Sequence, residues 1–200
     1  VAAVNDGIDD AFRNSGQVCG GLSRMLVPRS RLAEAEELAV RKAESFVLGD
    51  PYDPATTLGP VANVNQRDRV RAYIESGLSE GVRLLTGGPD APEGLETGFF
   101  VRPTVIEGTD PGHEVFTTEY FGPVLSVHVY DDADYDTVLA QMESVAPYAL
   151  TGAVIAQDRA AIAHAQHFLR FAAGNFYVND KPTGAVVGQQ PFGGGRASGT

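Results

Sequence analysis

The chain contains a single cysteine and no tryptophan among its 200 residues. Without a second thiol, Cys19 cannot form an intramolecular disulfide, and zinc sites that use several cysteine ligands are excluded. Disulfides are rare in reducing compartments, where free thiols persist. We therefore expect the protein in the cytoplasm, or in the mitochondrial matrix if its source is eukaryotic.

Basic residues are also scarce: Lys and Arg number 15 against 26 Asp and Glu, so the formal net charge is −11. A surface with this charge repels the phosphate backbone, so we expect no nucleic-acid partner. The sequence has no apolar run as long as a membrane span, and we expect no membrane partner.

The four histidines do not indicate a metal site. His164 and His167 lie on one predicted helix at a spacing that could bind a metal, but no third ligand is evident, so we expect no metal. A Cys–His hydrolase would need a histidine within hydrogen-bond reach of Cys19, and none can be assigned from the sequence.

Short apolar strands alternate with amphipathic helices along the chain. This alternation predicts an α/β fold, a three-layer αβα arrangement around a mostly parallel sheet. Ser30 and Asp158 are expected to cap helices, and Pro103 is expected to place its strand at the edge of the sheet. The expected strands cover residues 24–27, 84–86, 99–106, 124–130, 152–156 and 175–178, and the expected helices include residues 2–17 and 135–143.

Cys19 follows the run Asn14-Ser15-Gly16-Gln17-Val18 and precedes Gly20-Gly21. Glycines allow a substrate to approach the main chain, and a thiolate is a strong nucleophile, so this setting favours covalent catalysis. Taken alone, the segment favours a buried cysteine that acts as a small hydrophobic residue, and only the two motifs further along the chain reverse this preference. In parallel sheets, ligands usually bind at the carboxyl ends of the strands. Cys19 precedes a strand, so that rule does not place it.

A second motif, Glu119-Tyr120-Phe121-Gly122-Pro123, comes directly before a predicted strand. If the segment is extended, Glu119 and Phe121 lie on the same side. A carboxylate can accept hydrogen bonds from ribose hydroxyls, and an aromatic ring suits a flat nicotinamide. The alternative is a solvated glutamate before an ordinary turn, with Phe121 filling the core.

A third motif, Pro191-Phe192 followed by Gly193-Gly194-Gly195, has the composition of a binding loop. A flexible linker is the alternative, but solvent exposure would bring Phe192 no gain in stability.

Together, the order and spacing of the three motifs resemble the aldehyde dehydrogenase superfamily over essentially all 200 residues. The resemblance implies a catalytic-domain fragment, residues 1–200, whose NAD-binding Rossmann domain lies upstream of Val1. The chain begins without Met and ends directly after a glycine-rich turn, which we interpret as a piece of a longer protein.

The resemblance also implies roles for individual residues. Cys19 would be the nucleophile, and its backbone N–H would contribute to an oxyanion hole. Glu119 would bind the ribose of the cofactor, Phe121 would pack beside the nicotinamide, and Phe192 would line the aldehyde site. The implied cofactor is NAD, with NADP not excluded. The general base and the asparagine oxyanion donor of the family come from upstream sequence.

The segment from Asn175 to Phe192 resembles Δ1-pyrroline-5-carboxylate dehydrogenases, which oxidise glutamate γ-semialdehyde in proline catabolism. The resemblance implies that main-chain N–H groups of Thr183, Gly184 and Ala185 bind the substrate carboxylate. Gly20 and Ala185 depart from positions that are often serine in that subfamily. A general aldehyde or another semialdehyde is therefore an alternative substrate, and a folded but inactive fragment is a second alternative. We expect the parent protein to be a homo-oligomer.

Overall fold

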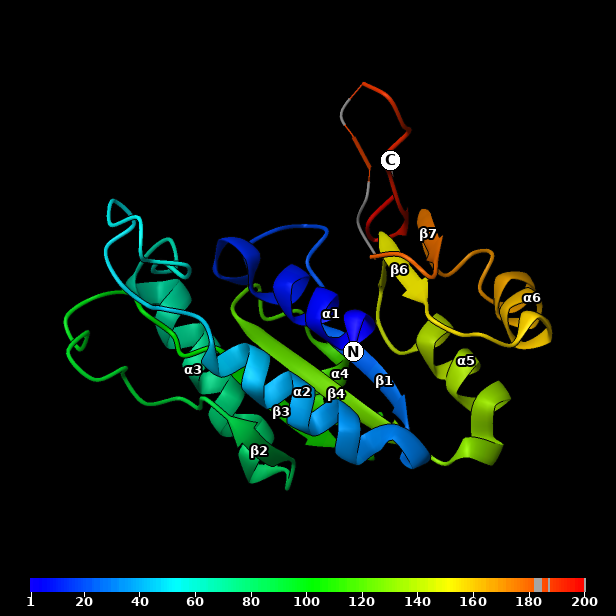
Figure 1. Cartoon of the computed structure of the whole chain (residues 1–200), viewed down its shortest axis with the longest axis horizontal. Coiled ribbons are helices and arrows are strands. Elements are labelled where there is room, and N and C mark those ends of the chain that lie inside the picture. The colour runs from blue at the N-terminus through cyan, green and yellow to red at the C-terminus, as the bar shows by residue number, and fades with distance from the viewer. Residues whose placement is uncertain (182–184, 187, 200) are drawn as a thin grey trace.

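The computed structural model describes residues 1–181, 185–186 and 188–199 (Figure 1). Thr183 and Gly184, two of the residues predicted to bind the substrate carboxylate, lie outside this range. The helices are α1 (Ala2–Phe12), α2 (Leu32–Glu44), α3 (Val64–Ser79), α4 (Glu114–Thr117), α5 (Tyr135–Ser144) and α6 (Arg159–Phe168). The strands are β1 (Arg24–Pro28), β2 (Arg83–Thr86), β3 (Thr104–Gly108), β4 (Val124–Tyr130), β5 (Tyr148–Ala149), β6 (Thr151–Val154), β7 (Asn175–Val178) and β8 (Gly195–Arg196).

The main sheet has the strand order β1-β4-β3-β2. Strand β4 is the centre of the parallel part: it pairs with β1 on one side and β3 on the other, and only β2 runs antiparallel. Strands β6 and β7 form a separate parallel pair, and β5 pairs antiparallel with β8. The expectation of a mostly parallel sheet is confirmed.

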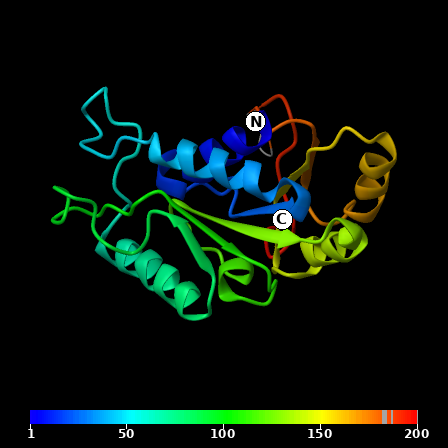
Figure 2. The same ribbon diagram turned by 60° about the horizontal axis from the view of Figure 1, so that its bottom comes forward.

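Helices cover both faces of the main sheet, as Figure 2 shows with α2 on one side and α3 on the other. Both faces can be covered because successive side chains of a strand point to opposite faces of the sheet, and here both sets include buried apolar residues. Leu125 of β4 packs with α1 and α2, whereas the preceding Val124 packs with α3 and α4. Each fully buried Leu or Ile contributes about 1.5–3 kcal/mol. The three-layer α/β architecture is thereby confirmed.

A smaller core joins α5 and α6 to the β6–β7 pair, and its buried centre is Leu139, Ala165 and Leu169. Asp158 caps α6 as predicted: its carboxylate accepts a hydrogen bond from the N–H of Ala160 at 2.8 Å.

Two predictions about helix caps and sheet edges were wrong. Ser30 does not cap α2, because residues 29–31 form a 3₁₀ turn and Arg31 takes the N-cap position. Ser30 instead donates from its backbone N–H to the carboxylate of Asp132 at 3.0 Å, and its hydroxyl bonds the same group. Pro103 does not mark an edge of the sheet. It is the residue immediately before β3, and β3 lies between β4 and β2.

His128 is a buried titratable group in the central strand. It is 5% exposed, its ring contacts Phe116 edge-to-face at 5.2 Å, and its Nδ1 has no partner among the described atoms. Burial lowers the pKa of His128 below its ordinary value, although a hydrogen bond that the protonated ring can donate to Gln141 and the charge of Asp110 act in the opposite direction. Burial therefore favours the neutral form of the imidazole.

We expect His128 to make the fold acid-sensitive. Because its pKa is lower in the folded state, the unfolded chain binds the proton more tightly, and stability falls as the pH drops below the unfolded value of about 6.5. The loss stops growing below the depressed pKa of the folded state. Urea unfolding at pH 7.5 and 5.5 measures this loss, which His128→Gln should reduce. An unchanged pH dependence in the variant would show that other groups cause it.

Candidate active site

The parallel pairing of β1 and β4 brings the first two motifs to one edge of the sheet. Cys19 lies just before β1, and residues 119–123 lie just before β4. In the β1–β4 ladder Arg24 is paired with Ser126, so the amino ends of both strands lie together. The motifs therefore meet at the amino ends of the strands, at the opposite edge from the usual ligand position in parallel sheets.

Cys19 occupies a tight turn with an exposed thiol. The N–H of Gly21 donates to the carbonyl of Val18 at 2.9 Å and closes the turn around Cys19 and Gly20. Upstream, Asn14, Ser15 and Gly16 have φ values of 51°, 56° and 72°, which place three consecutive residues in the left-handed region. The expected helix 2–17 thus ends at Phe12, followed by a tight turn with these reversed dihedral angles.

The Glu119 motif is not extended, because Phe121 has a φ of +54°. Its buried aromatic residue is Tyr120, whose ring stacks on Tyr73 of α3 with centroids 4.7 Å apart. The neighbouring Phe121 is 37% exposed and so does not fill the core. Glu119 is an exposed residue. Partial desolvation by the surrounding protein raises the pKa of its carboxyl group, and the positive charge of Arg69 partly offsets this rise.

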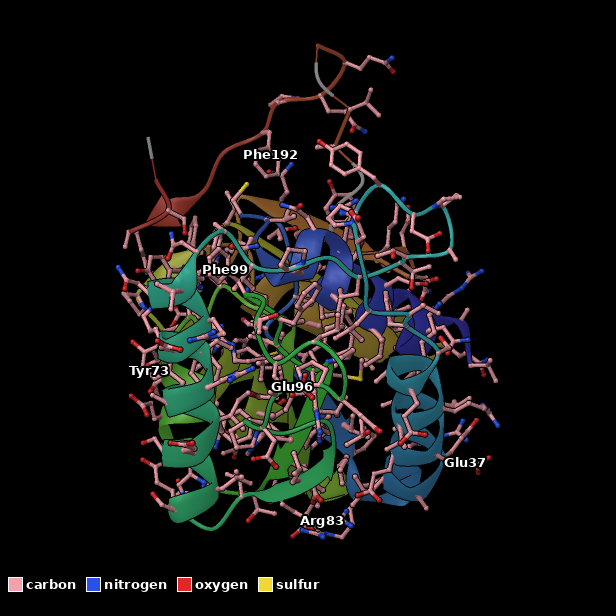
Figure 3. The ribbon with its side chains drawn as sticks, turned by 90° about the vertical axis from the view of Figure 1, so that its left-hand side faces the viewer. Glu37, Tyr73, Arg83, Glu96, Phe99 and Phe192 are labelled. Atoms are coloured by element: carbon pink, nitrogen blue, oxygen red, sulfur yellow. The ribbon has the colours of Figure 1, made fainter. Side chains whose placement is uncertain are left out.

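Phe192 is held in place through its two neighbours. The side-chain amide of Asn175, at the start of β7, donates to the carbonyl of Pro191 at 3.1 Å and accepts from the N–H of Gly193 at 3.3 Å. A Cβ on Gly174 would lie 1.8 Å from the carbonyl oxygen of Gly193, so the segment rests directly on the backbone before β7. Figure 3 shows Phe192 on the C-terminal segment, at the end of the molecule opposite Arg83.

One cleft of about 1220 Å³ is lined by residues of all three motifs. It brings together Cys19, Glu119, Phe121 and Phe192, and Lys181 adds a positive charge. Of the other predicted site residues within the described part, Gly20 is buried and Ala185 is half-buried, and neither lines this cleft.

Three polar residues hold these motifs in place and were not predicted from the sequence: Gln17, Gln66 and Asn175. Each uses a side-chain amide to bond main-chain groups of a distant segment. Gln17 lies inside a motif already singled out, which is a signal that could have found it. Asn175 likewise begins the segment 175–192 that was singled out, whereas Gln66 has no comparable signal, because glutamine is common on helices.

Within residues 1–181, 185–186 and 188–199, no group of three His, Cys, Asp or Glu side chains could hold a metal ion. His164 instead contacts the carboxylate of Asp136 at 2.7 Å, linking α6 to α5. The described helices include none with the length and apolar character needed to span a bilayer.

The fold and cleft define an α/β domain with an exposed cysteine thiol in its cleft. The aldehyde dehydrogenase family matches residues 1–200, and the chain belongs to this family. It is 43% identical over 204 residues to a probable delta-1-pyrroline-5-carboxylate dehydrogenase of Schizosaccharomyces pombe, covering 100% of this chain and 36% of that protein. The mitochondrial delta-1-pyrroline-5-carboxylate dehydrogenase of Danio rerio is 40% identical, with the same coverage.

Solved structures of the same family superpose on the whole chain. The delta-pyrroline-5-carboxylate dehydrogenase of Mycobacterium tuberculosis, bound with NAD and cobalamin, has a TM-score of 0.89 at 43% identity and covers 100% of this chain and 36% of that one. The Pseudomonas syringae aldehyde dehydrogenase C mutant, in complex with NAD⁺ and octanal, has a TM-score of 0.86 at 38% identity, covering 99% of this chain and 39% of that one. The chain thus spans little more than a third of the length of its relatives.

We expect Gly16→Ala to disrupt the site. A Cβ at position 16 would lie 1.9 Å from the carbonyl oxygen of Gly122, and the residue has a φ of +72°. Gly81→Ala is the matched control, since Gly81 has a φ of +94° but no atom within 4 Å of a Cβ. Backbone strain alone costs about 1–3 kcal/mol, so Gly81→Ala should lose that much stability and Gly16→Ala clearly more, by chemical denaturation. Equal losses in the two variants would contradict the close contact.

Proposed function

We propose that the protein to which this chain belongs oxidises an aldehyde to a carboxylate with NAD⁺, and that its substrate is L-glutamate γ-semialdehyde. The observation that supports this most directly is the shared cleft of Cys19, Glu119, Phe121 and Phe192. The names of the relatives from S. pombe and D. rerio support the choice of substrate.

Cys19 would act as the nucleophile. Its thiolate adds to the carbonyl carbon of the aldehyde and forms a thiohemiacetal, whose oxyanion can accept a hydrogen bond from the Cys19 N–H. Loss of the hydride gives a thioester on Cys19, and water then releases the carboxylate and regenerates the thiol. The exposed position of the thiol on a tight turn supports this role, since an aldehyde can reach it from the cleft.

Glu119 and Phe121 fit the nicotinamide half of NAD, which supplies the hydride acceptor when bound. The ionised Glu119 carboxylate can accept hydrogen bonds from two ribose hydroxyls. Phe121 presents a partly exposed aromatic side chain to the same cleft, although a phenylalanine gains stability from burial. A bound planar ring would cover it. The residues that distinguish NAD from NADP would belong to the upstream domain, so NADP stays an alternative.

The substrate carboxylate would bind to main-chain N–H groups of Thr183, Gly184 and Ala185. Lys181 lines the cleft a short distance before them and adds a favourable charge for an anionic substrate. A general aldehyde dehydrogenase is the alternative, and the likeness to the P. syringae enzyme complexed with octanal favours it. The ratio of kcat/KM for glutamate semialdehyde and for octanal distinguishes the two.

The remaining machinery would come from the rest of a longer homo-oligomeric protein. We propose that residues 1–200 form the nucleophile-bearing domain and that the general base and second oxyanion donor lie on the upstream domain. On this proposal the isolated fragment folds without oxidising aldehydes. We place the protein in the cytoplasm or, in a eukaryote, in the mitochondrial matrix.

We expect Cys19→Ser in the full-length protein to lose nearly all dehydrogenase activity, because an alcohol is a much weaker nucleophile than a thiolate. Iodoacetamide should inactivate the wild type with one equivalent incorporated at Cys19. If the variant retains more than about a tenth of wild-type kcat/KM, a loss below roughly 1.4 kcal/mol, Cys19 is not the nucleophile.

Glu119→Gln should weaken cofactor placement more than aldehyde binding. Loss of a charge-assisted hydrogen bond costs about 1.5–3 kcal/mol, which would appear as a raised KM for NAD⁺, a lowered kcat, or both. Because only the carboxylate accepts both hydroxyls, wild-type affinity for NAD⁺ should fall as the pH drops through the raised pKa of Glu119. The variant should lack this dependence. Unchanged KM and kcat would exclude the ribose role.

A further inference from the structure

The two turns that carry the proposed nucleophile and cofactor contacts touch through their backbones. We call residues 14–21 the nucleophile turn and residues 119–123 the cofactor turn. Gly16 of the first lies against Gly122 of the second so closely that a Cβ would lie 1.9 Å from the Gly122 carbonyl oxygen. The relative position of the two turns therefore sets where Phe121 lies relative to Cys19.

Both turns contain backbone conformations that are unfavourable on their own. Asn14 and Ser15 have φ values of 51° and 56°, and Phe121 has a φ of 54°. Such conformations in non-glycine residues persist only where neighbouring structure imposes them. For Phe121 the close contact with Gly16 is made by the next residue, so further contacts are needed to hold Phe121 itself.

A single segment supplies contacts to both turns. Residues 59–66, which we call the bridging segment, run into the first turn of α3. On the side of the nucleophile turn, the Ser15 hydroxyl donates to the carbonyl of Gly59 at 2.7 Å, and the Ala62 N–H donates to Oε1 of Gln17 at 2.9 Å.

On the side of the cofactor turn, the contacts come from one side chain. Nε2 of Gln66 donates to the carbonyl oxygens of Tyr120 at 3.1 Å and Phe121 at 2.6 Å. Two donors of one amide group thus hold consecutive carbonyls, which fixes the two peptide groups that flank the strained Phe121.

The Gln66 side chain is itself held in this orientation. Its backbone N–H donates to the side-chain oxygen of Asn63 at 2.9 Å, the N-cap of α3. Its Oε1 accepts from the guanidinium of Arg69 on the next turn of the helix. With the amide oxygen bonded to Arg69, the NH₂ group is directed to the cofactor turn.

We propose that Gln66 is a positioning residue, which acts through the backbone of Phe121 to align the nicotinamide side of the cleft with Cys19, and that Gln17 fixes the other end of the same bridging segment. This inference rests on the proposed dehydrogenase function. In the absence of the Gln66 contact, Cys19 keeps its own turn and its reactivity, while Phe121 and the bound cofactor lose their alignment.

The test uses the full-length protein with Gln66→Glu and its matched control Asn65→Asp. Glutamate keeps the size of Gln66 but cannot donate to the two carbonyls, and Asn65 is an exposed residue on the same helical turn that undergoes the same change from amide to carboxylate. Hydrogen exchange of the backbone amides of Phe121, Gly122 and Val124, measured without cofactor, should be faster in Gln66→Glu and unchanged in Asn65→Asp.

Enzyme kinetics should also distinguish Gln66→Glu from the control Asn65→Asp. Because small misplacements of reacting groups can cost about 10²-fold in rate, we expect kcat of Gln66→Glu to fall at least tenfold. The primary isotope effect with an aldehyde deuterated at the carbonyl carbon should increase, since hydride transfer becomes slower than the other steps. The rate of Cys19 alkylation in the cofactor-free protein should stay within twofold of the wild type.

Gln66→Glu results equal to those of Asn65→Asp would overturn the proposal. So would a loss of kcat accompanied by an equal loss of Cys19 alkylation, because that pattern indicates general destabilisation. If Gln66→Glu does not fold, Gln17→Met breaks the other anchor, and a wild-type kcat and isotope effect in that variant would also overturn it. A wild-type protein that oxidises no aldehyde refutes the proposed function, whereas the exchange comparison still tests the role of Gln66.

Discussion

The backbone contact between Gly16 and Gly122 is the constraint on which the rest of the site depends. No side chain fits between the two residues, because even a Cβ on Gly16 would overlap the carbonyl group of Gly122. The contact holds a turn with an exposed thiol against a turn with an exposed carboxylate and an exposed aromatic ring. The reversed dihedral angles at Asn14, Ser15 and Phe121 occur on the two sides of this contact, where the chain must turn sharply to allow it.

The main sheet makes that contact possible. Parallel neighbours have their amino ends at one edge, so the pairing of β1 with β4 brings together the segments that precede them. The same sheet is covered by helices on both faces, and α3 of one layer supplies Tyr73 and Gln66 to the turn before β4. The site therefore combines a fixed strand register with anchors from one helix.

Much of this arrangement could be predicted from local patterns. Strand β4 has the predicted bounds because its residues alternate between two buried faces, and Asp158 caps α6 because its carboxylate reaches a free N–H. Ser30 does not cap α2 because it hydrogen-bonds instead to the carboxylate of Asp132, 102 residues away in the sequence. No local pattern encodes such a partner. The two-residue strands β5 and β8 were missed for the same reason: their pairing is decided by tertiary contacts.

The structure also separates the groups that would perform the chemistry from those that would choose the substrate. Cys19, Glu119 and Phe121 lie next to the main sheet, whereas Phe192 belongs to a segment anchored on β7 through Asn175. Asn175 bonds the main chain of Pro191 and Gly193, so it fixes the path of the segment independently of the side chain at 192. On the proposed function, substitutions at Phe192 would reshape the aldehyde site without disturbing the contact between Gly16 and Gly122. On the same proposal, this division gives a physical reason why one scaffold could accept different aldehydes.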